Sequence, residues 1–198
     1  MLYKIAHFFR AKMPWLWNLL DIINAFLFSV RFGNRLKCKE SLICNQYQNE
    51  TGYEIKPIRD ICTDDLTKFF SRQPIDAFKF FNPHGFDPKS IKNLQNNKAF
   101  LGYVFIDKHI IVGYCFNRSF FIGKGFRGRM VDINFRGNGL GTIMNRLLND
   151  IGFGIGLRLF ETVNKHNVAS YKSALSASNV KIIEQKSDGD LYLEIMNN

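Results

Sequence analysis

The segment FRGNGLGT, residues 135–142, connects a strand-like run to the most regular helical pattern in the chain. Residues 129–133 before it, RMVDI, include the β-branched side chains that favour a strand. Apolar residues after it recur at the spacing that lines one face of an α-helix: Leu140, Ile143, Met144, Leu147, Leu148 and Ile151. Alternating glycines let the backbone approach a ligand closely, and the unpaired N–H groups of a helix start favour an anion. The segment therefore predicts a phosphate-binding turn between a strand and a helix.

The pattern Arg136-x-x-Gly139-x-Gly141 after a strand resembles the coenzyme-A-binding signature of the GNAT superfamily of N-acetyltransferases. A second segment, Val163-x-x-x-Asn167-x-x-Ser170, is similar to another signature of that family. A Rossmann loop would need G-x-G-x-x-G early in a βαβ unit, with an acidic partner for the ribose, and the sequence has neither. The alternative, a glycine-rich turn that merely links strand to helix, explains the first segment but not the second.

Strand-like and helical segments between residues 53 and 195 follow the order β α α β β β α β α β β, which is the order of the GNAT fold. We therefore expect an α/β (α+β) fold with a mixed central sheet flanked by helices over residues 51–198. Residues 1–50 are expected to form an amphipathic helical extension and a linker, with the polar stretch 33–52 as that linker. Residues 117–128, rich in Gly, Phe and Arg, are expected to be a connection between strands.

The charge and cysteine pattern narrows the class of protein. A formal charge of +10 favours anionic partners, and no RNA-binding or helix-turn-helix signature is present, so nucleic acid is disfavoured. The four cysteines form no C-x-x-C pair and no cluster with the four histidines. We expect reduced thiols, a cytoplasmic protein and no metal site.

The chain begins with an apolar segment, residues 13–30, flanked on both sides by basic residues. Asn18, Asp21 and Asn24 interrupt it, which disfavours a membrane-spanning helix. One helical face is apolar: Leu16, Leu19, Leu20, Ile23, Phe26 and Leu27. Residues 1–36 therefore suit peripheral association with the inner face of the membrane. Packing of this helix on the catalytic domain, or on a second subunit in a homodimer, is an open alternative.

The family resemblance implies a binding site for acetyl-coenzyme A (acetyl-CoA). It implies that the strand residues Arg129, Met130 and Val131 pair with the pantetheine arm. Backbone N–H groups of the turn would hold the pyrophosphate, and the turn comprises Arg136, Gly137, Asn138, Gly139, Leu140, Gly141 and Thr142. Asn167 and Ser170 would lie near the amide groups of the cofactor, although Asn167 is equally suited to cap a helix.

The acid and the base of catalysis do not follow from the resemblance. Many family members carry a Tyr seven residues after the signature Asn, where this chain has Ala174, and Tyr171 and Ser173 are nearby substitutes. An amine acceptor arrives largely as ammonium, so a group must take its proton. His84 and Asp132 are the candidates for that base. A structural turn histidine and a capping carboxylate are the alternative interpretations.

The resemblance implies an N-acetyltransferase that moves an acetyl group from acetyl-CoA to a primary amine of a small molecule, without a metal. Residues 81–84, FNPH, and the basic amphipathic start of the chain look similar to GNAT proteins of bacterial surface-polysaccharide synthesis. This local resemblance implies that the acceptor is an amino sugar. Acetylation of a protein N-terminus or lysine is an alternative. A rival of another class is a membrane-associated protein that binds acyl-coenzyme A without catalysis.

Overall fold

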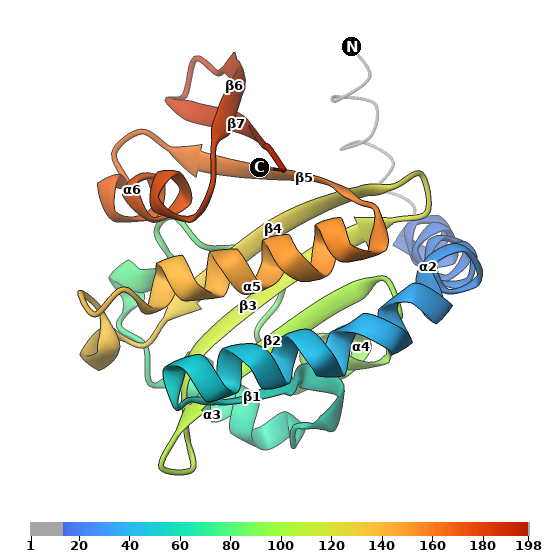
Figure 1. Ribbon diagram of the computed structural model, residues 1–198, viewed down its shortest axis with the longest axis horizontal. Coiled ribbons are helices and arrows are strands. Elements are labelled where there is room, and N and C mark those ends of the chain that lie inside the picture. Colours follow the sequence, from blue (N-terminus) through green and yellow to red (C-terminus); the bar gives the residue numbers. More distant parts are fainter. Residues whose placement is uncertain (1–13, 198) are drawn as a thin grey trace.

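One mixed sheet of seven strands forms the centre of the structure, a computed structural model that describes residues 14–197 (Figure 1). The strand order is β1-β2-β3-β4-β5-β7-β6, and every neighbouring pair is antiparallel except β4 and β5. The strands are β1 Glu54–Pro57, β2 Phe100–Asp107, β3 Ile110–Phe120, β4 Lys124–Val131, β5 Arg158–Asn164, β6 Val180–Gln185 and β7 Asp190–Ile195. The predicted fold class is therefore confirmed.

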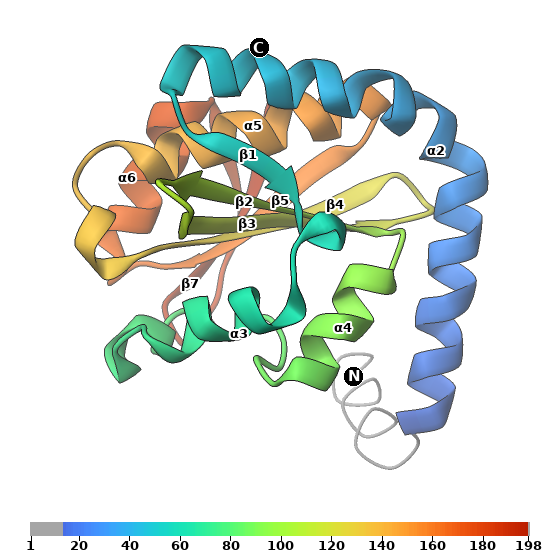
Figure 2. The same cartoon turned by 90° about the horizontal axis from the view of Figure 1, so that it is seen from below.

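Helices cover both faces of this sheet (Figure 2). They are α2 Pro14–Thr51, α3 Thr63–Ser71, α4 Pro88–Asn96, α5 Leu140–Ile155 and α6 Val168–Ala177, with short 3-10 turns that include η2 Ile75–Phe78 and η3 Ile133–Phe135. Helix α5 and the second half of α2 lie on one face, and α3 and α4 lie on the other. The order of elements after α2 is the predicted order.

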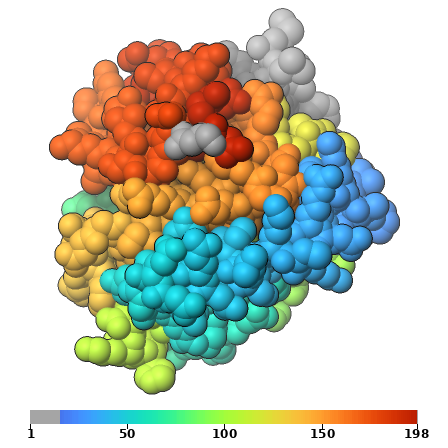
Figure 3. Space-filling view, viewed as in Figure 1, coloured from blue at the N-terminus to red at the C-terminus, as the bar shows by residue number. Residues whose placement is uncertain are grey.

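The linker interpretation of residues 33–52 is wrong, because α2 continues unbroken to Thr51. The helix bends along its length (Figure 2), and its second half runs alongside α5, so that the two segments adjoin at the surface (Figures 1 and 3). Phe32, Cys44 and Tyr47 are buried in the core, and the Tyr47 hydroxyl donates a hydrogen bond of 2.6 Å to Asp150 on α5. Most polar residues of this stretch form the exposed side of an amphipathic helix, whereas Glu40 is buried and bonded to Arg59 and Tyr103. A separate unit over residues 1–50 stays a prediction.

The first half of α2 has an unusual orientation, because polar side chains face the protein beside the buried Phe28, while most of its apolar side chains do not. The Asn24 amide donates to the Ser119 carbonyl at 3.0 Å and accepts from the Phe121 N–H at 3.0 Å. Arg31 donates to the Phe121 carbonyl at 2.8 Å. Seven apolar side chains on the opposite side of the helix are exposed: Leu19, Leu20, Ile22, Ile23, Phe26, Leu27 and Val30. The predicted apolar face exists, and it points to solvent. Residues 1–13 lie outside the described part of the chain.

The expected connection over residues 117–128 is also wrong, because β3 and β4 form a hairpin with only residues 121–123 between them. Glycine here marks close packing instead of a loop. A Cβ at Gly128 would come within 2.6 Å of the Phe116 ring, and one at Gly125 within 2.9 Å of Leu159. Both glycines therefore let large neighbours lie against the strand.

Strands β4 and β5 pair only at their starts. Their parallel register covers three residue pairs, from Lys124 with Arg158 to Phe126 with Phe160. Beyond Phe126 no pairing joins them, and β7 takes the other edge of β5. The backbone of β4 from Arg127 to Val131 consequently keeps polar groups without a partner on β5, and this split in the sheet contains the candidate site. None of the helices within residues 14–197 is long and apolar enough to cross a membrane.

Candidate active site

A cavity of about 560 Å³ occupies the split between β4 and β5. It is lined on one side by the turn before α5 and by α6, and on the other by residues of η2 and the segment after it. Eleven of the twelve residues predicted to bind the cofactor line it: Arg129, Met130, Val131, Arg136, Gly137, Gly139, Leu140, Gly141, Thr142, Asn167 and Ser170. Asn138 is exposed and lies in the same turn, but it is not part of the cavity lining.

The glycine turn has a backbone that requires glycine. Gly137 and Gly139 have φ values of 86° and 77°, in the left-handed region that L side chains rarely adopt. Gly139 is the N-cap of α5, and its carbonyl accepts from Thr142 N–H at 2.9 Å. A Cβ at Gly141 would come within 3.2 Å of Ser173 Oγ on α6. The turn thus presents helix-start N–H groups to the cavity at close range, an arrangement suited to an anion.

The second predicted segment holds α6 at the cavity. The Asn167 side chain caps α6 by accepting from Ser170 N–H at 3.2 Å, so the capping interpretation is confirmed. Arg129 on β4 donates to the Ser170 carbonyl at 2.7 Å and to its hydroxyl at 3.0 Å. These bonds fix α6 against β4 at the wall where both residues line the cavity.

A buried charge cluster lies beneath the split, and sequence reasoning missed it. Glu161 on β5 accepts from Arg127 Nε at 2.6 Å and from Arg129 Nη1 at 2.6 Å. All three side chains are buried: Glu161 is 4% exposed, Arg127 0% and Arg129 6%. Arg127 also donates to Asn149 on α5 at 2.5 Å. Burial alone would raise the pKa of Glu161, but the two guanidinium groups outweigh it and lower that pKa. The available signal was Arg at two alternate positions of one strand, which share a face.

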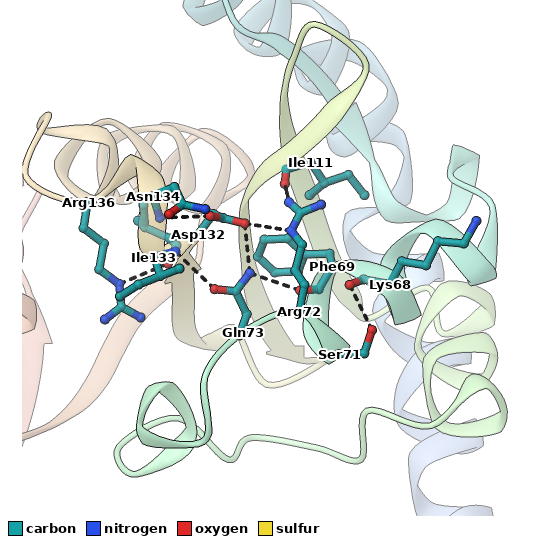
Figure 4. Close-up of polar contacts among 11 residues, drawn as sticks. Lys68, Phe69, Ser71, Arg72, Gln73, Ile111, Asp132, Ile133, Asn134 and Arg136 are labelled. Carbon is teal, nitrogen blue, oxygen red and sulfur yellow. Dashed lines mark hydrogen bonds and ion pairs between the residues drawn. The ribbon is translucent and has the colours of Figure 1, made fainter.

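Asp132 is held by a network that ties α3 to the residues before the glycine turn (Figure 4). Its carboxylate accepts from Arg72 Nε at 2.8 Å, from Gln73 Nε2 at 2.9 Å and from Asn134 N–H at 3.0 Å. Gln73 in turn accepts from Ile133 N–H at 3.1 Å. Burial opposes ionisation of Asp132, but these hydrogen bonds and Arg72 lower its pKa. A carboxylate so engaged is poorly placed to accept a further proton, which favours the capping interpretation.

His84 lies among aromatic rings and outside the cavity lining. Its Nδ1 is 2.8 Å from the Gly85 carbonyl, which can only accept, so Nδ1 carries the proton. Nε2 then accepts from the Tyr114 hydroxyl at 2.9 Å. Burial lowers the pKa of His84 and keeps it neutral. Both nitrogens are engaged, so these contacts favour the turn-histidine interpretation.

Tyr171 packs against the hydrophobic core and does not line the cavity, whereas Ser173 does. Ala174 is fully buried, and its small side chain leaves no group at the position where many members of the resembled family carry Tyr. The structure therefore brings none of the three predicted catalytic residues to the cavity. It brings Asp76 and Phe80 there instead, which the sequence did not single out, together with Phe81 from the segment 81–84. No cluster able to hold a metal occurs among the described residues.

No family model matches the chain, and no curated protein sequence matches it. Solved structures do share its fold. The GNAT domain of S. lividans PAT is 14% identical, covers 72% of this chain and 89% of that one, and has a TM-score of 0.62. The ribosomal-protein-S5-alanine acetyltransferase of Vibrio fischeri is 18% identical, the match covers 72% of this chain and 91% of that one, and the TM-score is 0.57. The aminoglycoside acetyltransferase AAC(6')-Ib, solved with coenzyme A and kanamycin, is 12% identical, the match covers 71% of this chain and 92% of that one, and the TM-score is 0.54. The chain therefore has the GNAT fold.

Proposed function

We propose that the protein transfers an acetyl group from acetyl-CoA to a primary amine. The observation that carries the proposal is the coincidence of the glycine turn, the split between β4 and β5 and one continuous cavity. The residues fit such a donor. Backbone N–H groups from Gly137 to Thr142 bind its pyrophosphate, and the unpaired edge of β4 binds the amide groups of its pantetheine arm. AAC(6')-Ib, of the same fold, was solved with acetyl-CoA bound.

For the acceptor we propose an amino sugar. The support is the local similarity of residues 81–84 and the aromatic side chains Phe80 and Phe81 in the cavity wall, which suit the apolar face of a sugar ring. AAC(6')-Ib, whose complexes contain aminoglycosides, shows that this fold accommodates amino sugars. The alternative of a protein N-terminus has support from the ribosomal-protein acetyltransferase of the same fold.

Thiol release separates these possibilities. Purified protein is incubated with acetyl-CoA and, in separate reactions, with amino sugars, N-terminal peptides and lysine peptides. Release of coenzyme A with amino sugars supports the proposal. Release only with peptides moves the function to protein acetylation. Tight binding of acetyl-CoA without release in any reaction supports the non-catalytic rival.

We further propose that the protein is cytoplasmic and that the first half of α2 binds the inner face of the membrane. Its seven exposed apolar side chains lie together on the side away from the sheet, while Asn24 and Arg31 fasten the other side to the β3–β4 turn. The net charge of +10 adds attraction to anionic lipid. A homodimer through the same surface is the alternative.

Phe26→Glu tests this apolar surface, because Phe26 lies in the middle of the surface and is 66% exposed. Full-length protein should sediment with vesicles of phosphatidylglycerol, and the variant should remain in the supernatant. Leu42→Glu is the matched control, since Leu42 is 70% exposed on the second half of α2 and receives the same charge. If wild-type protein ignores the vesicles and forms a dimer that Phe26→Glu dissociates, the surface is a subunit interface.

A further inference from the structure

The cavity has an acceptor side, which is distinct from the side of the glycine turn. It is formed by η2 and the segment after it, where Asp76, Ala77, Phe80 and Phe81 line the wall. The donor side and the acceptor side meet at the split in the sheet, so a molecule bound on one side can reach a molecule bound on the other.

Charge in this cavity is predominantly positive. Four cationic side chains line it: Arg127, Arg129, Arg136 and Lys172. Two acidic residues line it as well, but Glu161 is buried and bonded to two arginines. Asp76 is exposed, and among the described residues nothing hydrogen-bonds or ion-pairs with its carboxylate. It is therefore the lining carboxylate that is free to receive a cationic ligand.

The backbone holds Asp76 in a defined place relative to the split. Within η2 the Ala77 N–H donates to the Pro74 carbonyl at 2.9 Å, and the Lys79 N–H donates to the Asp76 carbonyl. Gln73, three residues before Asp76, is buried and bonded to Asp132 and to Ile133 N–H, directly after the end of β4. The carboxylate thus sits on a short turn anchored to the same strand end that leads into the glycine turn.

We propose that Asp76 binds the ammonium group of the acceptor and that Phe80 and Phe81 pack against the ring that carries it. The inference rests on the proposed function and names its acceptor class: a cationic primary amine on a ring with an apolar face. A positively lined cavity repels an ammonium ion, and one free carboxylate at its mouth reverses that repulsion locally. The adjacent rings add dispersion and cation–π attraction. The amine is thereby bound at the split, where the thioester of the donor would lie.

The test compares Asp76→Asn with Asp64→Asn, using glucosamine as acceptor. Asp64 is exposed in the first turn of α3 and outside the cavity lining, so its substitution removes the same charge elsewhere. A hydrogen bond between charged groups is strong enough that Asp76→Asn should raise the KM for glucosamine about 10-fold or more. The affinity for acetyl-CoA should be unchanged, and Asp76→Glu should restore most of the lost affinity. Asp64→Asn should behave like wild type.

Calorimetric titration of glucosamine into protein saturated with coenzyme A provides a readout that does not need turnover. Weaker binding in Asp76→Asn than in wild type supports the inference. If wild type and Asp76→Asn have equal KM values and bind glucosamine equally, the role of Asp76 is overturned and the proposed acetyl transfer is left intact. Absence of glucosamine binding in wild type would overturn the acceptor class itself. Absence of acetyl-CoA binding in wild type would instead refute the proposed function.

Discussion

The two sides of the cavity are constructed in different ways. The donor side consists largely of backbone: the glycine turn, the first N–H groups of α5 and the unpaired edge of β4. The acceptor side consists of side chains from η2, positioned by contacts between residues about sixty positions apart in the chain, such as Gln73 with Asp132. A backbone site depends on a contiguous motif, whereas a side-chain site depends on tertiary packing. Substitutions on the two sides should therefore fail in different ways.

The largest effect is expected beneath both sides, at the buried charge cluster. Glu161→Gln leaves Arg127 and Arg129 without their shared carboxylate, and breaking a buried ion pair costs about 3–5 kcal/mol. Chemical denaturation should show this loss in the free energy of unfolding. Glu194→Gln is the control, since Glu194 pairs with Arg158, whose side chain is 65% exposed, and should cost about 1 kcal/mol or less.

The pH dependence of stability provides a second check on this cluster. The folded-state pKa of Glu161 is lowered, so its contribution is present above the unfolded pKa of about 4.3 and is lost as the pH falls through the folded value. The acid limb of the stability curve, below about pH 4.3, should be shallower in Glu161→Gln. Parallel acid limbs in the two proteins would show that the carboxylate is not stabilised by the arginines.

A smaller effect, confined to the donor side, is expected at the N-cap of α5. Gly139→Glu combines a strained left-handed backbone with a negative charge at the proposed pyrophosphate site, and it should weaken acetyl-CoA binding about 100-fold or more. Gly139→Ala separates the two causes, because it keeps the strain and omits the charge. Calorimetry measures both, and unchanged affinity in Gly139→Glu would exclude the turn as the phosphate site.

The same difference explains what could be read from the sequence. The order of strands and helices, the glycine turn and the Asn167 cap follow from local periodicity and contiguous motifs, and all three were predictable. The continuity of α2 was not, because its polar stretch is the exposed side of a helix whose inner side only packing reveals. Asp76 and the Glu161 cluster were missed, because they line a cavity that exists only where β4 and β5 stop pairing. No local sequence pattern specifies where that pairing ends.

A still smaller effect is expected at Asp132, which connects the two sides of the cavity. Asp132→Asn removes the ion pair with Arg72 and places an amide among three hydrogen-bond donors, so it should cost about 1–3 kcal/mol of stability. The network reaches the glycine turn through η3. The affinity for acetyl-CoA should therefore change by less than about 3-fold, because a tenfold change would require about 1.4 kcal/mol of binding free energy. Asp65→Asn, at an exposed pair with Lys68, is the matched control. A larger loss of affinity than of stability would place Asp132 in direct contact with the donor.

The smallest effect on turnover is expected at His84, and it separates the two interpretations of that residue. Loss of a general base commonly lowers turnover by about 100-fold or more. The structure instead shows an imidazole that donates to the Gly85 carbonyl and accepts from the buried Tyr114 hydroxyl. His84→Ala would leave that hydroxyl unsatisfied, so we expect a loss of about 1–3 kcal/mol of stability with turnover reduced less than 10-fold.

Two further measurements make the His84 test decisive. Tyr114→Phe removes the donor to Nε2 while keeping the ring, so a turn histidine predicts that the double variant His84→Ala, Tyr114→Phe loses less stability than the sum of the single variants. Burial lowers the pKa of His84 in the folded state, so protonation below about pH 6.5 favours the unfolded chain and stability falls as the pH falls. That decline should be shallower in His84→Ala, while the acid limb of the turnover profile keeps its shape. A flattened turnover profile with unchanged stability would instead return His84 to the role of proton relay, and the acceptor side would then extend across the aromatic cluster to Tyr114.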